Sequence, residues 1–252
     1  MSRFIIEGFV SVKSAVSAGN REVFRILLEK SRYEAVMGSK LQKDEQRRYA
    51  SLTSCGVKCE ILDKTEYSEL VKGENSGGIA AEVGERRFMT EDNLLSVPDG
   101  YIAVLDGIED PFNYAYSIRS LYAAGVNALI VPNRCFENED ALLIRSSAGA
   151  YEHINIFRSE DIAQTCIKLK EKGWYIASTA KTEKARDLYR CSLKKPLCLV
   201  FGGEKRGIKQ EILNISDTVI KLKYPRDCRY SLPACCAVSV ISFECAKKIG
   251  AC

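Results

Sequence analysis

Short apolar runs of strand length recur along the second part of the chain, and helical patterns separate most of them. The runs lie at residues 101–105, 128–131, 154–157, 174–177, 197–201 and 218–222. The clearest intervening helix is predicted at 159–172, with Ser159 as its expected N-cap and Gly173 after its last turn. Strands that alternate with helices indicate a parallel β-sheet covered by helices on both faces.

A last helix is predicted at 233–248. Its sequence is apolar on nearly every face as far as Glu244, so we expect it to be buried. Pro233 is acceptable at its start, because the first turn of a helix does not need that residue's N–H group. Cys235 and Cys236 lie in this apolar stretch and are interpreted as small core residues.

The first 85 residues predict a separate, smaller α/β unit. Strand patterns at 23–28, 58–62 and 78–83 alternate with helical patterns at 43–54 and 66–72. Between residues 84 and 100 the pattern breaks into a polar stretch rich in turn-forming residues. We therefore expect a domain at 1–85, a linker at 86–100 and a larger α/β domain at 101–252.

Composition and charge exclude several classes of protein. The chain has 252 residues, of which 46% are hydrophobic and 28% charged, and its formal net charge is +4. These values exclude collagen-like, disordered and coiled-coil proteins. The longest apolar runs fall far short of the roughly 18 residues that a membrane-spanning helix needs. Glu7 interrupts the N-terminal region before the apolar stretch of a signal peptide can form, so we expect a cytoplasmic protein.

The cysteines predict neither a disulfide framework nor a metal site. There are 11 of them, an odd number, and they are scattered along the sequence. No two have the C-x-x-C spacing, and His153 is the only histidine. A structural zinc site needs about four such ligands close together, so no metal is expected.

Three segments of the larger domain lie where a parallel sheet binds its ligands, near the carboxyl ends of strands. They are residues 106–113, followed by a helix that carries Arg119; residues 202–207; and residues 230–233. Taken singly, each segment has an ordinary structural explanation. Glycines suit a tight turn, Asn113 and Ser231 suit helix caps, and Arg119 suits an exposed position on a helix.

The combination of these segments is more specific. In chain order the sequence has Asp110-Pro111-x-Asn113, Ile118-Arg119, Ala123-Ala124-Gly125, Ser147-Ala148-Gly149-Ala150, Leu199-Val200-Phe201-Gly202-x-Glu204-x-x-Gly207 and Ser231-Leu232. Over about residues 101–248 this order resembles the SpoU (TrmH-like) RNA 2′-O-ribose methyltransferases. The resemblance implies an α/β fold with a C-terminal trefoil knot. It also implies S-adenosylmethionine as methyl donor and ribosomal or transfer RNA as substrate.

The same resemblance assigns site residues. Arg119, Asn113, Glu204 and Ser231 are the expected catalytic residues, and the cofactor is expected to contact Thr179, Gly202, Gly203, Gly207, Leu222 and Leu232. Methyl transfer from a sulfonium needs alignment and loss of the hydroxyl proton, but no metal. A guanidinium group is effectively always protonated, so Arg119 fits a phosphate clamp as well as the base that the family arginine is often taken to be.

Three departures from the family pattern keep a second interpretation open. Pro233 stands where the family usually has Asn, Ala115 replaces a common glycine, and Lys223-Tyr224 replaces Pro-Met. Because proline lacks both an amide side chain and a backbone donor, a non-catalytic RNA-binding or assembly protein of the same fold is the alternative. A nucleotide-binding oxidoreductase is disfavoured, since the dinucleotide glycine fingerprint is missing.

The smaller domain resembles the substrate-binding domain of the family, which is related to the ribosomal protein L30e type, at residues 7–16 and 77–83. Its basic residues are Arg21, Arg25, Lys30, Arg32, Lys40, Lys43, Arg47 and Arg48, which suit either phosphate contacts or a solvated surface. Tyr49 and Tyr67 are candidates for stacking on bases or for the core. The apolar stretch 234–243, together with the habit of the family, predicts a homodimer through the larger domain.

Overall fold

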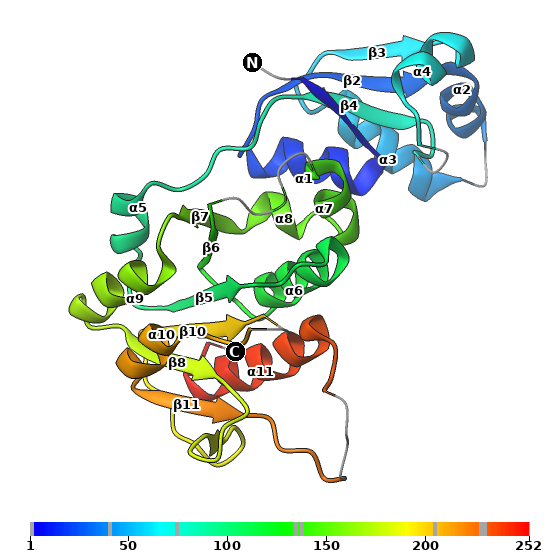
Figure 1. Cartoon of the computed structure of the whole chain (residues 1–252). Helices are drawn as coiled ribbons and strands as arrows, with labels where there is room; N and C mark the ends of the chain where they lie inside the picture. The colour runs from blue at the N-terminus through cyan, green and yellow to red at the C-terminus, as the bar shows by residue number, and fades with distance from the viewer. Residues whose placement is uncertain are drawn as a thin grey trace. The chain divides into compact units, whose positions relative to one another are not determined.

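The computed structural model describes residues 3–39, 42–73, 76–133, 136, 139–203, 206–226 and 231–251. The chain divides into two compact units (Figure 1). The first contains Met1–Arg87 together with Ile144–His153, and the second contains Phe88–Leu143 and Ile154–Cys252. Within the described ranges, no helix is both long and apolar enough to cross a membrane.

The first unit is a four-stranded mixed sheet with helices packed against it. Its strands are β1 (Phe4–Glu7), β2 (Val23–Glu29), β3 (Cys59–Leu62) and β4 (Ile79–Val83), and its helices are α1 (Phe9–Ala18), α2 (Lys30–Gly38), α3 (Lys43–Thr53), α4 (Lys64–Leu70) and α8 (Ala150–His153). The strand order is β1-β4-β2-β3, with β4 antiparallel to both neighbours and β2 parallel to β3. The strands and helices predicted for this region are confirmed to within a few residues, and β1, α1 and α2 are additional.

A buried ion pair ties the segment 144–153 into the first unit. Arg21 donates from its Nε and one terminal nitrogen to the two carboxylate oxygens of Glu152, at 2.9 and 2.8 Å, and both side chains are fully buried. A second terminal nitrogen of Arg21 donates to the carbonyl of Gly84. Arg21 is therefore a structural residue, and its assignment to an exposed basic cluster was wrong.

Burial also decides between the roles left open for two tyrosines of the first unit. Tyr49 and Tyr67 are buried, so the core interpretation is confirmed for both. Arg25 is half-buried and pairs with Glu60 and Glu82. Lys40 lies outside the described residues.

The second unit is a seven-stranded parallel sheet in the order β7-β6-β5-β10-β8-β11-β9. The strands are β5 (Tyr101–Asp106), β6 (Ala128–Pro132), β7 (Asn155–Ser159), β8 (Tyr175–Thr179), β9 (Arg186–Asp187), β10 (Leu197–Gly202) and β11 (Thr218–Lys221). All six apolar runs predicted as strands are confirmed, as is the parallel sheet. β10 lies between β5 and β8, both of which precede it in the chain. A strand order by itself does not show a knot, so the trefoil knot implied by the resemblance stays a prediction.

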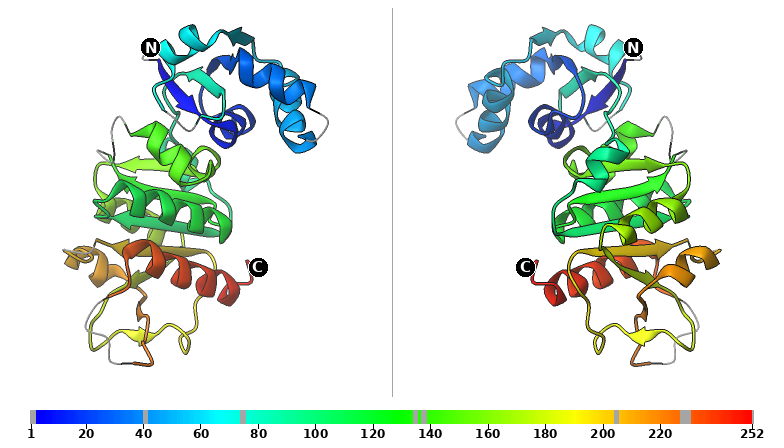
Figure 2. Two further views of the ribbon diagram at one scale, coloured as in Figure 1. Left: turned by 90° about the vertical axis from the view of Figure 1, so that its right-hand side faces the viewer. Right: turned by 90° about the vertical axis from the view of Figure 1, so that its left-hand side faces the viewer.

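Helices cover both faces of this sheet. The helices are α5 (Glu91–Leu95), α6 (Pro111–Ala123), α7 (Asp140–Ser146, shared with the first unit), α9 (Ile162–Glu171), α10 (Gln210–Ile215) and α11 (Ala234–Lys248). α9 and α10 form a core with alternate strand residues such as Ile102 and Val104. On the opposite face α6 and α11 lie side by side (Figure 2). There the Tyr101 hydroxyl of β5 donates to the carbonyl of Ser242 in α11.

Two local predictions for the second unit were wrong. The N-cap of α9 is Asp161, whose carboxylate accepts hydrogen bonds from the N–H groups of Ala163 and Gln164, whereas Ser159 ends β7. α11 is buried on one face only, and Cys236 is exposed at its start. Some apolar side chains of α11 are therefore left uncovered by the second unit.

Candidate active site

The carboxyl ends of three neighbouring strands form one edge of the second unit. β8 lies between β10 and β11, and all three run parallel. Thr179 ends β8, Gly202 ends β10, and Leu222 comes directly after β11. The sheet therefore brings these three predicted cofactor residues to the same edge.

Two loops cross at this edge with their backbones in direct contact. A Cβ atom on Gly203 would lie 2.2 Å from the carbonyl oxygen of Gly107, and one on Gly202 would lie 2.5 Å from the carbonyl carbon of Gly207. No side chain fits at these distances, so the crossing requires glycine. Gly207 itself has open space around it, but its φ of 63° is the left-handed conformation that favours glycine.

A cavity of about 250 Å³ lies beside this crossing. Its charged lining residues are Asp106, Glu109, Arg206 and Lys209, and its glycines are Gly107, Gly203 and Gly207. Burial raises the pKa of the Asp106 carboxyl group, and the positive charge of Lys209 opposes this shift. An acid of shifted pKa in a cavity at a strand end is a frequent feature of functional sites.

Side-chain contacts connect the loop after β8 to the segment that precedes α11. The Lys181 ammonium donates to the Ser231 hydroxyl at 2.7 Å and lies over the ring of Tyr224, 5.3 Å from its centre. The Tyr224 hydroxyl accepts a hydrogen bond from the backbone N–H of Leu232 at 3.3 Å. Lys181 and Tyr224 thereby hold Ser231 and Leu232 near the ends of β8 and β11.

α6 carries the other predicted catalytic residues. The Asp110 carboxylate caps the helix by accepting from the backbone N–H of Asn113, and Pro111 occupies its first turn. The Asn113 side-chain oxygen accepts a hydrogen bond from the Cys235 thiol of α11 at 3.1 Å. Arg119 is exposed and forms no hydrogen bond or ion pair with the residues that the structure describes. Its guanidinium group is therefore available to a ligand.

With this geometry established, comparison with known proteins identifies the family. A model of the SpoU rRNA methylase family matches residues 100–243, more than half of the 252-residue chain. The chain belongs to the SpoU rRNA methylase family. The resemblance found in the sequence is thereby confirmed. The chain is an RNA 2′-O-ribose methyltransferase that uses S-adenosylmethionine (AdoMet).

Relatives of this SpoU enzyme match it along most or all of its length. It is 30% identical over 171 residues to the 23S rRNA (guanosine-2′-O-)-methyltransferase RlmB of Shewanella oneidensis, covering 66% of this chain and 69% of that protein. It is 28% identical over 250 residues to RlmB of Yersinia pestis, covering 98% of each. The crystal structure of AviRb from Streptomyces viridochromogenes with AdoMet has the same fold, with a TM-score of 0.74 at 19% identity, over 97% of this chain and 90% of that one.

The site residues that the SpoU resemblance assigned fall into two groups. The first group lies at or just after the ends of β8, β10 and β11, or directly before α11: Thr179, Gly202, Gly203, Gly207, Leu222, Ser231 and Leu232. The second group, Asn113 and Arg119, lies on α6. Asn113 contacts Cys235 of α11, three residues after Leu232 in the chain. Glu204 lies outside the described residues.

The structure adds residues that the sequence reasoning did not assign to the site. Asp106 ends β5 and opens the segment 106–113 that the sequence placed near the ligand, but it was given no role there. Tyr224 was noted only as a departure from the family. Lys181 follows β8 in a polar stretch with no recognisable signal, because its role depends on contacts with residues more than 40 positions away.

Proposed function

We propose that this SpoU enzyme methylates the 2′-hydroxyl of a guanosine in 23S ribosomal RNA, in the cytoplasm. The observation that carries this proposal is the match to the RlmB proteins, one of which aligns over 98% of both chains. The names of these proteins specify both the RNA and the nucleoside. Transfer RNA, the other substrate expected from the sequence, is the competing outcome.

The edge formed by β8, β10 and β11 is the proposed AdoMet site. Gly107, Gly203 and Gly207 line the neighbouring cavity with backbone and no side chain, which suits a ligand held by main-chain hydrogen bonds. Thr179, Leu222 and Leu232 would flank the adenosine part. When bound, AdoMet supplies a methyl group on a positively charged sulfur that the ribose oxygen attacks in line.

Arg119 is proposed to orient the RNA, not to remove a proton. Guanidinium stays protonated in proteins, and its fork of N–H donors matches a phosphate group. Its exposure and its lack of a partner among the described residues leave this fork available. Asn113, Ser231 and Glu204 remain the other residues proposed to surround the reacting ribose.

The structure weakens the argument that Pro233 makes for a non-catalytic protein. It is the N-cap residue of α11, and its carbonyl accepts hydrogen bonds from the N–H groups of Cys236 and Ala237. A proline N–H is not needed at this point. The α11 helix therefore begins normally, and Pro233 does not argue against methyl transfer.

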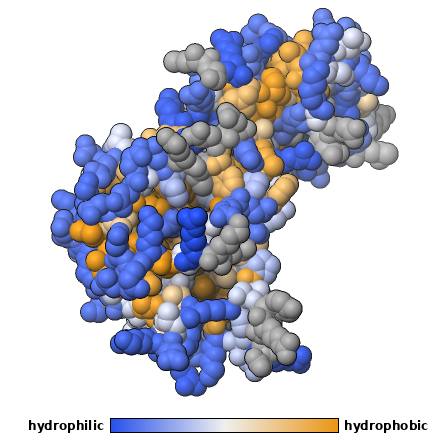
Figure 3. Space-filling model, viewed as in Figure 1, coloured by the Kyte–Doolittle hydropathy of each residue, from blue (hydrophilic) through white to orange (hydrophobic). Residues whose placement is uncertain are grey.

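A homodimer is proposed through α6 and α11. Phe112 and Tyr116 of α6 and Val240 and Phe243 of α11 are between 40% and 47% exposed, although all are large and hydrophobic. The two helices are joined by a 2.6 Å hydrogen bond between Ser120 and Ser239, so their exposed faces belong to one surface. Hydrophobic residues also reach the surface on the face shown in Figure 3. Burying such a surface in a two-fold dimer is a common solution.

The decisive experiment is a methyl-transfer assay with labelled AdoMet. Purified enzyme is incubated with unmodified 23S ribosomal RNA and, separately, with transfer RNA, and the 2′-O-methylated position is mapped. We expect incorporation at a guanosine of 23S RNA. Incorporation into transfer RNA alone would contradict the proposed substrate, and binding of AdoMet without incorporation into either RNA would favour the non-catalytic alternative.

A further inference from the structure

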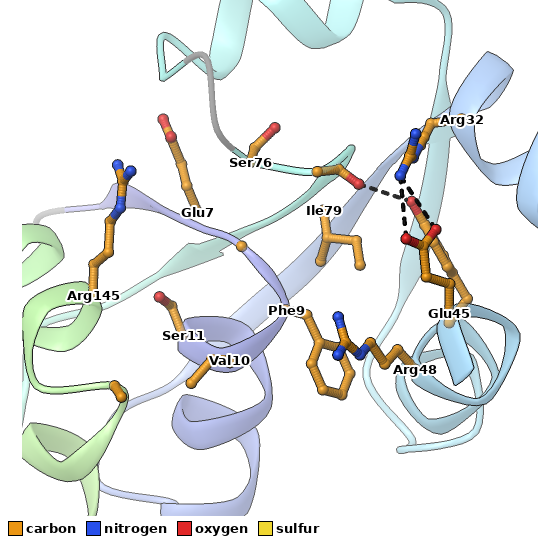
Figure 4. A pocket seen from close by; sticks show the side chains of 14 residues that line it. Glu7, Phe9, Val10, Ser11, Arg32, Glu45, Arg48, Ser76, Ile79 and Arg145 are labelled. Carbon is orange, nitrogen blue, oxygen red and sulfur yellow. Dashed lines mark hydrogen bonds and ion pairs between the residues drawn. The ribbon is translucent and has the colours of Figure 1, made fainter. Parts of the chain in front are cut away.

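The first unit contains a pocket that no part of the methyl-transfer site uses. Its volume is about 380 Å³, within the range of about 300 to 1,000 Å³ typical of ligand pockets. It lies between the start of α1, helices α2 and α3, and the segment that contains Arg145 (Figure 4). All of its lining residues belong to the first unit.

The start of α1 gives the pocket its donors. Gly8, Phe9, Val10 and Ser11, the N-cap and first turn of this ten-residue helix, all line the pocket. First-turn N–H groups have no acceptor inside a helix, and the helix dipole makes this end attractive to an anion. Gly8 has no side chain that could cap these groups.

Ser11 is independent evidence for a polar ligand. The whole residue is only 4% exposed, yet its hydroxyl makes no hydrogen bond with any residue in the described ranges. Figure 4 shows its hydroxyl pointing into the pocket. A nearly buried hydroxyl without a protein partner is costly unless water or a ligand satisfies it.

The charged side chains around the pocket leave a positive excess. Arg32 pairs with Glu45, and Glu7 accepts a hydrogen bond from the backbone N–H of Gly73. Arg145 has no ion pair among the described residues. The guanidinium of Arg48 lies over the ring of Phe9, 5.5 Å from its centre. An arginine on an aromatic ring offers both a positive charge and a flat surface for stacking.

We propose that this pocket binds one unpaired nucleotide of the substrate RNA. Its phosphate is held at the first turn of α1 by Ser11 and Arg145, and its base stacks beside Phe9 and Arg48. Unpaired bases can leave the helical stack and reach such a platform, whereas paired bases cannot. The inference deepens the proposed function, since it presumes that the substrate is RNA.

The test measures RNA binding by the full-length protein. The probe is a short single-stranded RNA of mixed sequence with a fluorescent label, and anisotropy is recorded at several salt concentrations. Arg48→Gln and Arg145→Gln are each expected to weaken binding by about fivefold to tenfold. Arg145→Gln should also reduce the salt dependence by about one phosphate contact, whereas Arg48→Gln, which removes a stacking partner, should reduce it less. Ser11→Ala is expected to weaken binding by a smaller factor. AdoMet affinity should not change in any of these variants.

Arg47→Gln is the matched control. Arg47 precedes Arg48 on α3 and is 80% exposed, but it pairs with Asp44 and does not line the pocket. If Arg48→Gln and Arg145→Gln bind RNA as tightly as Arg47→Gln does, the inference is overturned. It is also overturned if a duplex of the same sequence competes as well as the single strand. Thermal melting of each variant separates loss of binding from loss of folding.

The methylation assay keeps this inference distinct from the proposed function. If the pocket variants methylate 23S RNA normally and bind RNA as wild type does, the nucleotide-binding role of the pocket is overturned, and 23S RNA stands as the substrate. Weakened RNA binding in those variants, in a protein that methylates transfer RNA alone, would overturn the proposed substrate and support the pocket.

Discussion

The two candidate ligand sites of this SpoU enzyme differ in composition: one is formed mainly by backbone and the other by side chains. In the second unit the glycine crossing brings backbone against backbone, and a single added methyl group would lie 2.2 Å from a carbonyl oxygen. In the first unit the pocket is surrounded by arginine, serine and aromatic side chains. The backbone site should tolerate no change of shape, whereas the side-chain site should respond gradually to changes of charge and salt.

The comparison is tested most severely at Gly203. Gly203→Ala places a Cβ atom against Gly107, which should force the two loops apart, destabilise the fold by about 3 kcal/mol and remove detectable methylation. Gly38→Ala is the control, because a Cβ at Gly38 meets no atom within 4 Å. Calorimetric AdoMet binding and a methylation assay provide the measurements. Full activity in Gly203→Ala would show that the crossing can relax.

The second prediction separates catalysis from binding within the second unit. Arg119→Ala should lower the methylation rate roughly 1,000-fold, about 4 kcal/mol of transition-state free energy, and leave AdoMet affinity nearly intact. Arg119→Lys should restore little, because an ammonium group lacks the two-pronged geometry. Arg186→Ala, on the exposed edge strand β9, is the control. If the Arg119→Ala enzyme methylates RNA as fast as wild type does, Arg119 is a surface residue with no role in the reaction.

The third prediction concerns the ion pairs of the first unit. Glu152→Gln breaks the fully buried pair with Arg21 and leaves that charge without its carboxylate, so the free energy of unfolding should fall by about 3 kcal/mol. Asp44→Asn breaks the exposed pair with Arg47 and should change stability by less than about 0.5 kcal/mol. Urea titration of both variants measures the difference. Equal losses would mean that burial does not set the strength of these pairs.

The smallest effect is expected at Asp106. Because burial raises its pKa, the folded chain holds the proton more tightly than the unfolded chain, and wild-type stability falls as the pH rises from about 3.9 through the folded pKa. Asp106→Asn removes this loss. Its melting temperature should exceed that of wild type by no more than about 5 °C near neutral pH, and by less near pH 4. A difference that does not vary with pH would exclude this cause.

Much of the fold follows from local patterns. The apolar runs and the helical spacing between them predict the parallel sheet, because an apolar strand and an amphipathic helix must bury their faces against one another. The cap formed by Asp110 and Asn113 is equally local. Ser159 was mistaken for a cap because Asp161, two residues later, offers the same chemistry at the point where the helix actually begins.

The sequence by itself determined the family, the order of strands and helices along the chain, and which loops carry glycine and polar residues. Only the tertiary structure decided which distant residues meet. Arg21 became a buried partner of Glu152, 131 positions away, and Lys181 and Tyr224 came to hold the segment before α11. The physical reason is that a pattern records the preference of each residue for burial or water, whereas a partner is chosen by the packing of elements that sequence distance does not encode.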